Sequence, residues 1–362
     1  MLASLLGSAS TILAGMLATK APRHSRGLFS LLFIALALYS FLSTATLTSN
    51  EHYNGIWAIA VIFYTVYLLC YLHLTDNELS TNTWAEVWFI QPNLRYSRTQ
   101  KNVTRVRPTG QKISRKNFFM WRVCSLVALY AVMCVYYDLV DLPGFLQMQP
   151  QDFSPSKHVF FRRLRATEDP VTVRDVIIRI WTVFETVGCE WVALTSIHTF
   201  FAIVFVALGV DEPEDWPQLF GSISEAYTFR NYWTKFWHLL FYRTGTACAG
   251  WISGNVLCVR QRSQLSRYLN NFLVFFLSGA MHLFARRVIS GSLPGDWTVL
   301  VWFSGQPLLF LLEDEIIAKY QSLIGNKYRV LGQLAGYFWV SGFLLWSIPK
   351  INYAPLYKPE DI

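Results

Sequence analysis

Apolar segments long enough to cross a membrane follow one another through most of this 362-residue chain. Hydrophobic residues make up 53% of the sequence and charged residues only 15%, while 14 Trp and 18 Tyr can serve as interfacial anchors. Because a span needs about 20 consecutive apolar residues, the close spacing argues against separate soluble domains. The sequence therefore predicts a single integral membrane domain over residues 1–362, all-α and polytopic.

Six segments are clear candidates for spans and three are weaker. The clear candidates are 29–48, 55–75, 118–138, 271–289, 296–318 and 329–348. Of the weaker ones, 2–19 has no charged residue before it, and 176–210 is either one long bent helix or two short ones broken around Gly188. Segment 236–259 is interrupted by Arg243, Gly250 and Gly254, so it is tilted, broken or re-entrant. We expect about seven to nine transmembrane helices.

A basic loop is predicted over residues 76–117. Its second part, from 91 to 117, carries no acidic residue and contains Arg95, Arg98, Lys101, Arg105, Arg107, Lys112, Arg115 and Lys116. The positive-inside rule assigns this loop to the cytosol, together with the cluster Lys20, Arg23 and Arg26. Contact with anionic lipid explains the charges better than binding of nucleic acid, which we do not expect.

One polar stripe marks the apolar segment 271–289. Asn271, Phe275, Ser278 and His282 fall on one helical face, because steps of four, three and four residues return to the same side. An imidazole inside a membrane is costly unless it faces a protein interior or a wet cavity, so His282 is a functional candidate. The alternative is a core histidine that a neighbouring helix satisfies.

A second cluster, rich in aromatic and basic residues, covers Arg230–Arg243. Trp233 and Trp237 are four residues apart, His238 follows, and Lys235 and Arg243 flank them. This pattern is typical of an interfacial helix that holds a histidine beside two indoles, and we expect Tyr232 to point to another face. An aromatic belt without a catalytic role is the alternative.

Common motifs of soluble enzymes and metal sites are absent from the sequence. The six cysteines are scattered, without paired Cys-x-x-Cys motifs or the Cys/His spacing of a zinc site, so no metal is expected. No glycine-rich phosphate loop and no nucleophile elbow is present.

The two clusters together resemble a known family. The Arg230–His238 segment resembles the S-F-W-x-x-x-W-H signature of the wax-synthase-like branch of membrane-bound O-acyltransferases. The segment ending Phe275-x-x-Ser-Gly-x-x-His282 looks like the F-x-x-S-G-x-x-H block of the same branch. Gln306-Pro to Glu313-Asp314 lies where the family often has a similar polar interruption. The resemblance is most specific over 230–318, which we take as the catalytic region.

Within that branch the chain looks most like fungal acetyltransferases that modify terpenoids and meroterpenoids. The resemblance implies a helical bundle of the membrane-bound O-acyltransferase kind that encloses a reaction cavity in a multi-pass protein of the endoplasmic reticulum. It implies an acyl-CoA-dependent O-acyltransferase that moves acetyl from acetyl-CoA, its co-substrate, to a lipophilic alcohol, with no tightly bound cofactor. The essential histidine matches His282. A long-chain wax-ester or sterol acyltransferase stays open as an alternative.

The chemistry of ester formation suggests roles for these residues. An alcohol is a poor nucleophile, and an imidazole with a reference pKa of about 6.5 suits a general base near neutral pH, which favours His282. Ser278, Trp237 and His238 are candidates to orient groups or stabilise the oxyanion. Asn271 is roughly 16 Å of helix rise away, so it is assigned to cavity lining, as are Trp233 and Gln306. Crowding near His282 by large side chains favours a short acyl group (Phe272, Phe275, Phe276, Met281 and Phe284).

Coenzyme A carries several phosphate charges, so its site should offer cations. The candidates are Lys235, Arg243, Arg260, Arg262 and Arg267. Snorkelling of long basic side chains at the membrane surface is the alternative explanation.

Two functions of other classes also fit intramembrane polar residues. A transporter could use the side chains of Glu185, Glu190, His198 and Glu313 along a pathway, although no paired broken segments appear in two equivalent halves. A membrane terpene cyclase would use acidic residues to protonate an olefin or epoxide. A mass gain of one acetyl unit distinguishes acetyl transfer from isomerisation.

Overall fold

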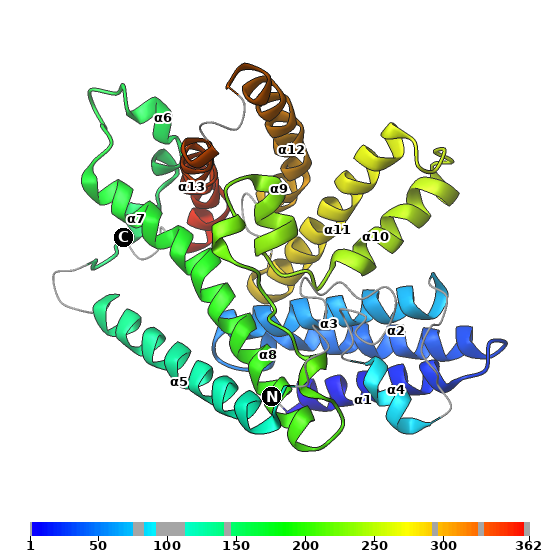
Figure 1. Ribbon diagram of the computed structural model, residues 1–362. Helices are drawn as coiled ribbons and strands as arrows, with labels where there is room; N and C mark the ends of the chain where they lie inside the picture. The colour runs from blue at the N-terminus through cyan, green and yellow to red at the C-terminus, as the bar shows by residue number, and fades with distance from the viewer. Residues whose placement is uncertain are drawn as a thin grey trace. The chain divides into compact units, whose positions relative to one another are not determined.

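The computed structural model describes residues 2–74, 83–91, 113–140, 146–291, 296–324 and 329–357. These residues form helices and connecting loops, and no β-strand occurs among them (Figure 1). The chain divides into two compact units. The first consists of Met1–Thr104 and Leu239–Leu311, and the second of Arg105–His238 and Leu312–Ile362. Most of the predicted basic loop, 76–82 and 92–112, lies outside the described residues.

Within the described ranges, seven helical segments are long and apolar enough to cross a membrane. They are Leu2–Lys20, Arg26–Thr46, Tyr53–His73, Arg115–Val140, Val173–Ala207, Gln264–Ser290 and Val330–Ala354. The all-α polytopic fold is therefore confirmed, at the lower end of the expected number of spans. The predicted span 296–318 forms helix α12 (Trp297–Ile324) but is not among the seven, because polar residues such as Gln306, Glu313 and Asp314 interrupt its apolar run.

The two ambiguous segments have different outcomes. Segment 176–210 is one long helical span, in which a single π-helical turn at Phe184–Gly188 joins α7 (Val173–Val183) to α8 (Cys189–Ala207). Segment 236–259 is broken. It contains only α10 (Tyr242–Trp251), followed by a π-helical turn over Ile252–Val256. Ten α-helical residues are too few to span a bilayer.

Small residues explain why the weakly apolar first segment packs well. Helix α1 (Leu2–Lys20) turns a face of Ser, Gly, Thr and Ala toward α2 (Arg26–Leu42). A Cβ at Gly7 would lie 3.0 Å from the Tyr39 ring, and the hydroxyls of Ser8 and Ser40 lie 2.9 Å apart. In lipid, where apolar burial gives little drive for association, small residues and polar contacts hold helices together.

The remaining helices of the first unit surround α3 (Glu51–His73). Helix α11 (Gln264–Ser290) lies beside α3 and α10, as Figure 1 shows, and the Sγ atoms of Cys70 and Cys248 meet 2.6 Å apart between α3 and α10. The short helix α4 (Trp84–Ile90) is fixed by the Tyr67 hydroxyl, which donates to the Ile90 carbonyl at 2.7 Å. These contacts place α11, which carries the polar stripe, against the centre of this unit.

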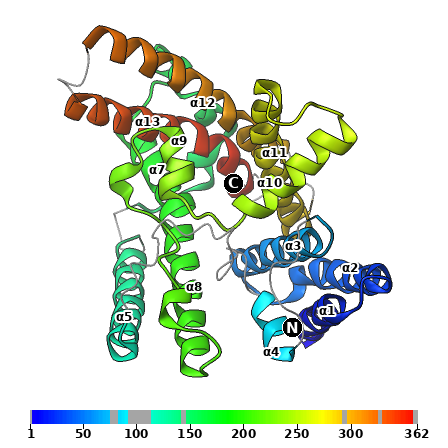
Figure 2. The same ribbon diagram turned by 45° about the vertical axis from the view of Figure 1, so that its right-hand side comes forward.

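The second unit is built on two helix pairs. Helix α5 (Arg115–Val140) runs beside α8, and α7 packs on α13 (Arg329–Leu356) (Figure 2). Large apolar side chains of α5, among them Trp121, Val127 and Tyr130, are exposed. In a membrane span such exposure suits contact with lipid.

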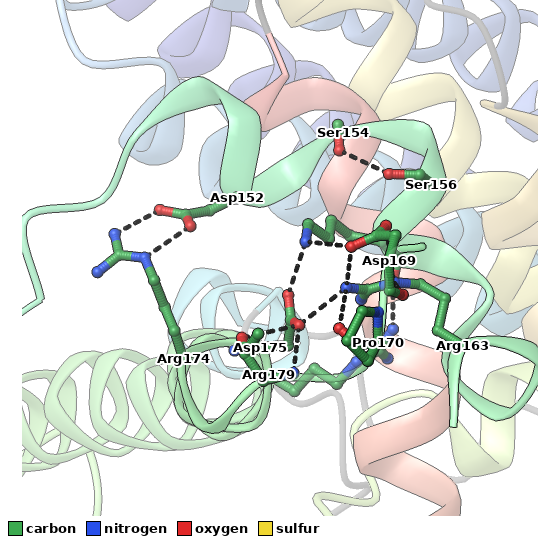
Figure 3. Close-up of polar contacts among 11 residues, drawn as sticks. Asp152, Ser154, Ser156, Arg163, Asp169, Pro170, Arg174, Asp175 and Arg179 are labelled. Atoms are coloured by element: carbon green, nitrogen blue, oxygen red, sulfur yellow. Dashed lines mark hydrogen bonds and ion pairs between the residues drawn. The ribbon is translucent and has the colours of Figure 1, made fainter. Parts of the chain in front are cut away.

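A cluster of ion pairs orders the connection that leads into α7 (Figure 3). Arg163, at the end of the single-turn helix α6 (Phe160–Arg163), is 3% exposed and pairs with Asp169 at 2.8 Å and Asp175 at 2.9 Å. Lys157 lies 3.2 Å from Asp175. The Thr172 hydroxyl accepts the N–H of Asp175, which caps α7. A buried guanidinium with two carboxylate partners fixes this segment firmly.

Candidate active site

His282 lies on α11 with its ring flat against Phe303 of α12. The ring centroids are 4.7 Å apart and the planes differ by 10°. Gly279 permits this approach, because a Cβ there would lie 2.9 Å from the Phe303 Cβ and 3.2 Å from the Leu300 Cα. The Ser-Gly-x-x-His order thus has a packing reason: the glycine lets α12 come close enough to cover one face of the imidazole.

The other residues of the polar stripe differ in burial. Ser278 and His282 are both half-buried, one helical turn apart. Asn271 is exposed, near the other end of α11. The structure therefore groups Ser278 with His282 and leaves Asn271 apart from them.

Gln306 is a buried amide on the facing helix. It is 1% exposed, and its Nε2 donates to the Trp302 carbonyl at 3.0 Å. Along α12 it lies between Phe303, which covers His282, and Phe310, whose ring meets Phe275 with centroids 5.6 Å apart. Gln306 is therefore level with the segment of α11 that contains Ser278.

The expected crowding around His282 is only partly correct. Phe272, Phe276 and Phe284 are exposed on the outer face of α11, so they do not crowd the histidine. They point away from the inward positions because residues two apart on a helix, such as Phe284 and His282, lie on nearly opposite sides. Phe303 of α12 instead covers the imidazole, and the sequence pattern of α11 alone could not indicate it.

The Trp-His segment in the second unit is a short helical stretch with a sharp end. Helix α9 (Phe229–Asn231) continues as one π-helical turn over Tyr232–Phe236, and Trp237 is extended. The backbone N–H of Trp237 donates to the backbone carbonyl of Tyr232 at 2.7 Å, and the rings of these two residues stack with centroids 5.7 Å apart. The prediction that Tyr232 points to another face is wrong, because a π-helical turn brings residues five apart together.

Other aromatic rings pack around Trp237 and His238. The centroid of Trp233 lies 6.2 Å from that of Trp237, as its spacing predicts. Phe220 presents its edge to Trp237 at 5.2 Å and to His238 at 5.7 Å. Since the helix ends at Phe236, neither Trp237 nor His238 continues the helical face of Trp233, which corrects the expectation of one interfacial helix over this segment. Burial raises the pKa of the Tyr232 phenol, so this ring stays neutral.

A hollow of about 420 Å³ opens beside this aromatic cluster. It is lined by Pro217, Gln218, Phe220, Gly221, Ser222, Glu225, Thr234 and Lys235. At its rim the Lys235 ammonium lies 3.0 Å from the Glu225 carboxylate. Phe220 is shared between the hollow and the aromatic cluster. Lys235 is thus already paired with an acid, which reduces its value as a phosphate ligand.

The other predicted cations belong to the first unit. Arg243 is half-buried at the start of α10, while Arg260 and Arg262 are exposed in the loop before α11. Arg267 is exposed in the first turn of α11. Arg262 has a φ of 63°, in the left-handed region that non-glycine residues adopt infrequently. Three of these arginines therefore gather at the exposed start of the helix that carries His282.

Two further polar groups make contacts that the sequence pattern did not indicate. At the end of α11, Arg287 pairs with the buried Asp296 at 3.6 Å and lies 4.6 Å over the Trp297 ring. In the second unit, Glu313 is 5% exposed and accepts N–H groups at the start of the Trp-His segment. The sequence signal for the Arg287–Asp296 pair was two adjacent arginines in an apolar helix, followed by an aspartate. For Glu313 the sequence indicated a polar interruption and a candidate pathway acid of a transporter, but not these contacts.

No group of three His, Cys, Asp or Glu side chains in the described ranges is placed to hold a metal ion.

The fold and these segments define a multi-pass membrane protein with a histidine inside one of its spans. Residues 216–305 match the Membrane bound O-acyl transferase family, and this match contains both the Trp-His segment and the helix of His282. Over these residues the chain is similar to the membrane-bound O-acyltransferase family.

Fungal acetyltransferases of secondary metabolism are among its relatives. The chain is 30% identical to acetyltransferase aurG of Calcarisporium arbuscula over 61% of its own length and 54% of that protein. It is 37% identical to acetyltransferase atnC of an Arthrinium species, over 43% of its own length and 36% of that protein. It is 27% identical to acetyltransferase ataH of Aspergillus terreus, over 78% of its own length and 92% of that protein. The chain thus spans about half the length of the first relative and about a third of the second. No solved structure matches.

Proposed function

We propose that this protein is an acyl-CoA-dependent O-acyltransferase that moves acetyl from acetyl-CoA to a hydroxyl of a lipophilic acceptor such as a terpenoid or meroterpenoid. The observation that carries the proposal is His282, which lies in a membrane span within the family match and is covered by Phe303. The relatives aurG, atnC and ataH are named acetyltransferases, which supports the acetyl group. We place the protein in the endoplasmic reticulum, where lipophilic alcohols and cytosolic acetyl-CoA meet.

In the proposed reaction His282 is the general base. It accepts the proton of the acceptor hydroxyl while the oxygen attacks the thioester carbonyl of acetyl-CoA. The tetrahedral intermediate then collapses, the carbon–sulfur bond breaks, and the coenzyme A thiolate takes up the proton. The products are an acetate ester and free coenzyme A. No covalent acyl-enzyme is required, and Phe303 fixes the plane of the imidazole during transfer.

The remaining candidates serve this step in supporting roles. Ser278 is one turn from His282 and half-buried, which suits a hydroxyl that orients the acceptor. The indole N–H of Trp237 and the imidazole of His238 are donors for the developing oxyanion. Gln306 is assigned to the lining of the site at the level of Ser278, and Asn271 and Trp233 are kept as candidate lining residues.

The acyl donor is proposed to bind through its phosphates at the start of α11. Arg260, Arg262 and Arg267 are exposed there and lie close in sequence to the helix of His282. Arg243 is a further candidate in the same unit, and Lys235 is a weaker one because Glu225 already pairs with it.

The contacts of two acidic residues favour acyl transfer over transport or cyclisation. Glu185 accepts the Tyr136 hydroxyl at 2.7 Å, and Glu313 accepts three N–H groups. These bonds give both carboxylates a structural task, whereas a proton or substrate pathway needs acids that can exchange partners.

The proposal is tested by expressing the protein in yeast membranes and supplying hydroxylated terpenoids and a fatty alcohol with acetyl-CoA or palmitoyl-CoA. We expect a hydroxylated terpenoid to gain the mass of one acetyl unit, with acetyl-CoA preferred. Preferred palmitoyl transfer to the fatty alcohol would indicate a wax synthase instead. Conversion of a substrate without change of mass would indicate a cyclase.

A further inference from the structure

Glu313 is a buried carboxylate of α12 that meets the start of the Trp-His segment. Its Oε1 accepts the N–H of Phe229 at 2.5 Å and the indole N–H of Trp339 at 3.1 Å. Its Oε2 accepts the N–H of Arg230 at 3.1 Å. A carboxylate that is 5% exposed is costly unless its oxygens are hydrogen-bonded, and three N–H donors meet this need.

These donors include the first N–H groups of the helical stretch Phe229–Phe236. The first N–H groups of a helix have no acceptor within the helix. Glu313 takes two of them, and the Thr228 hydroxyl accepts the third, the N–H of Asn231, at 3.0 Å. Three successive N–H groups at the start of the stretch therefore have acceptors, and two of the three bond to one side chain from a helix that is distant in the sequence.

Helix α13 fixes the same point from another side. A Cβ at Gly336 would collide with the Tyr227 carbonyl, so the helix and this loop touch through the glycine. The Tyr337 hydroxyl donates to the Ser224 carbonyl at 2.6 Å. The chain just before the Trp-His segment is thus held by backbone contacts to α13, while the segment itself begins on Glu313.

We propose that Glu313 is a positioning residue for acyl transfer: it anchors the start of the Phe229–Phe236 stretch and thereby sets the place of Trp237 and His238 at its end. The link runs through backbone bonds, from Glu313 to Phe229, along the helical stretch, and through the Tyr232–Trp237 bond. The proposal rests on the role assigned above to Trp237 and His238. Glu313 itself touches neither substrate nor the reacting atoms.

The chemistry of the site predicts that an amide cannot replace this carboxylate. A glutamine offers one acceptor oxygen, and its NH₂ group would face an N–H donor. Glu313→Gln therefore leaves at least one of the Phe229, Arg230 and Trp339 N–H groups without an acceptor. A buried donor left without a partner destabilises its local arrangement, and small displacements of catalytic groups reduce turnover strongly.

The experiment combines kinetics with hydrogen exchange on purified Glu313→Gln protein. We expect kcat for acetyl transfer to fall about tenfold or more, with KM for acetyl-CoA changed less than about threefold. Backbone exchange of the 226–238 peptide should rise, while peptides of α5 and α8 exchange as in the unchanged protein. Asp314→Asn is the matched control. It removes only the exposed pair with Arg230, so both readouts should stay within about twofold of normal.

Two results would overturn the proposal. Unchanged exchange in the 226–238 peptide would show that Glu313 does not hold the segment. Faster exchange with normal kcat would show that its position does not matter for turnover. Exchange needs no substrate, so it tests the anchor even if no acceptor is acetylated, which would count against the proposed function alone.

A second pair of variants covers the case in which Glu313→Gln does not accumulate. Thr228→Val removes the third cap without changing the size of the side chain much, and Thr228→Ser keeps the hydroxyl. We expect the valine variant to show lower kcat and faster exchange at 226–238, and the serine variant to restore both. Equal behaviour of the two variants would contradict the positioning role of the capped start.

Discussion

The imidazole of His282 lies parallel to the ring of Phe303, with 4.7 Å between centroids and 10° between planes. This contact depends on Gly279, beside which α12 passes at a distance that leaves no room for a Cβ. The glycine, the histidine and the phenylalanine therefore form one packing unit across two helices, and the orientation of the proposed base is set by the helix that faces it.

Gly279→Ala should disturb this unit. The new methyl group would meet the Leu300 backbone and the Phe303 Cβ, neither of which can rotate away, so α12 must shift. We expect acetyl transfer to fall about tenfold or more, measured as kcat/KM at equal protein amounts. Gly305→Ala on α12 is the control, because a Cβ there meets nothing within 4 Å. Equal activity of the two alanine variants would contradict the role of the close approach.

Replacing Tyr232 should harm turnover about as much as replacing Trp237. The two rings stack, and the backbone bond between them closes the π-helical turn. We expect Tyr232→Leu and Trp237→Leu each to lower kcat about tenfold, while Tyr130→Leu, on the exposed face of α5, leaves it unchanged. Normal kcat in the Tyr232 variant, with Trp237→Leu impaired, would separate the two rings in function.

Regular helices were largely predictable from the sequence, while local breaks and long-range partners were not. The spans around α2, α3, α5, α11 and α13 follow from apolar runs, whose length is a local property. Tyr232 was misplaced because nothing in residues 230–238 distinguishes a π-helical turn from an α-helix. Glu313 was identified as a polar interruption and as a candidate pathway acid, but its partners Phe229 and Trp339 could not be predicted, since they are distant in the sequence.

The same distinction applies to the proposed site. The register of Ser278 and His282 follows from helical geometry, so their common face could be predicted. Phe303 could not, because which ring covers the histidine depends on how two helices pack. The broken segment 236–259 was predicted only as one of three alternatives, since interruptions by arginine and glycine do not fix where a helix stops.

Arg163→Met should lower the stability of the second unit. It leaves the buried Asp175 with only Lys157 as a cationic partner, and breaking a buried ion pair costs about 3 kcal/mol. We expect a lower thermal unfolding midpoint in detergent, whereas Arg162→Met, at an exposed position, should change it little. Identical midpoints for the two variants would show that the cluster in Figure 3 contributes nothing to stability.

The loss of stability in Arg163→Met should depend on pH with a defined sign. The hydrogen bond from Arg163 holds the pKa of Asp169 below its usual range. Its contribution to stability is therefore present above the unfolded pKa of about 3.9 and is lost as pH falls through the lower folded value. The midpoint difference between the unchanged protein and Arg163→Met should be constant from about pH 5 to 8 and shrink below about pH 4. A difference that grows in acid would contradict this assignment.

Removing the arginines at the start of α11 should weaken binding of the acyl donor. Arg260→Gln and Arg267→Gln are expected to raise KM for acetyl-CoA several-fold with little change in kcat, and more so at low salt, because screening weakens exposed charges. Lys235→Gln should have a smaller effect, since Glu225 already pairs with this ammonium. A larger KM change for Lys235→Gln than for both arginine variants would move the phosphate site to the second unit.

The most direct test of the central proposal compares two intramembrane histidines. His282→Ala removes the proposed base. His198→Ala removes an imidazole of α8 that packs on the ring of Trp216. Initial rates of acetyl transfer to a hydroxylated terpenoid are measured in membranes that contain equal amounts of each protein. We expect His282→Ala to lose about 10²–10⁴-fold in kcat and His198→Ala to stay within a few-fold of normal. A His282→Ala protein that accumulates normally and turns over near the normal rate would contradict the proposal.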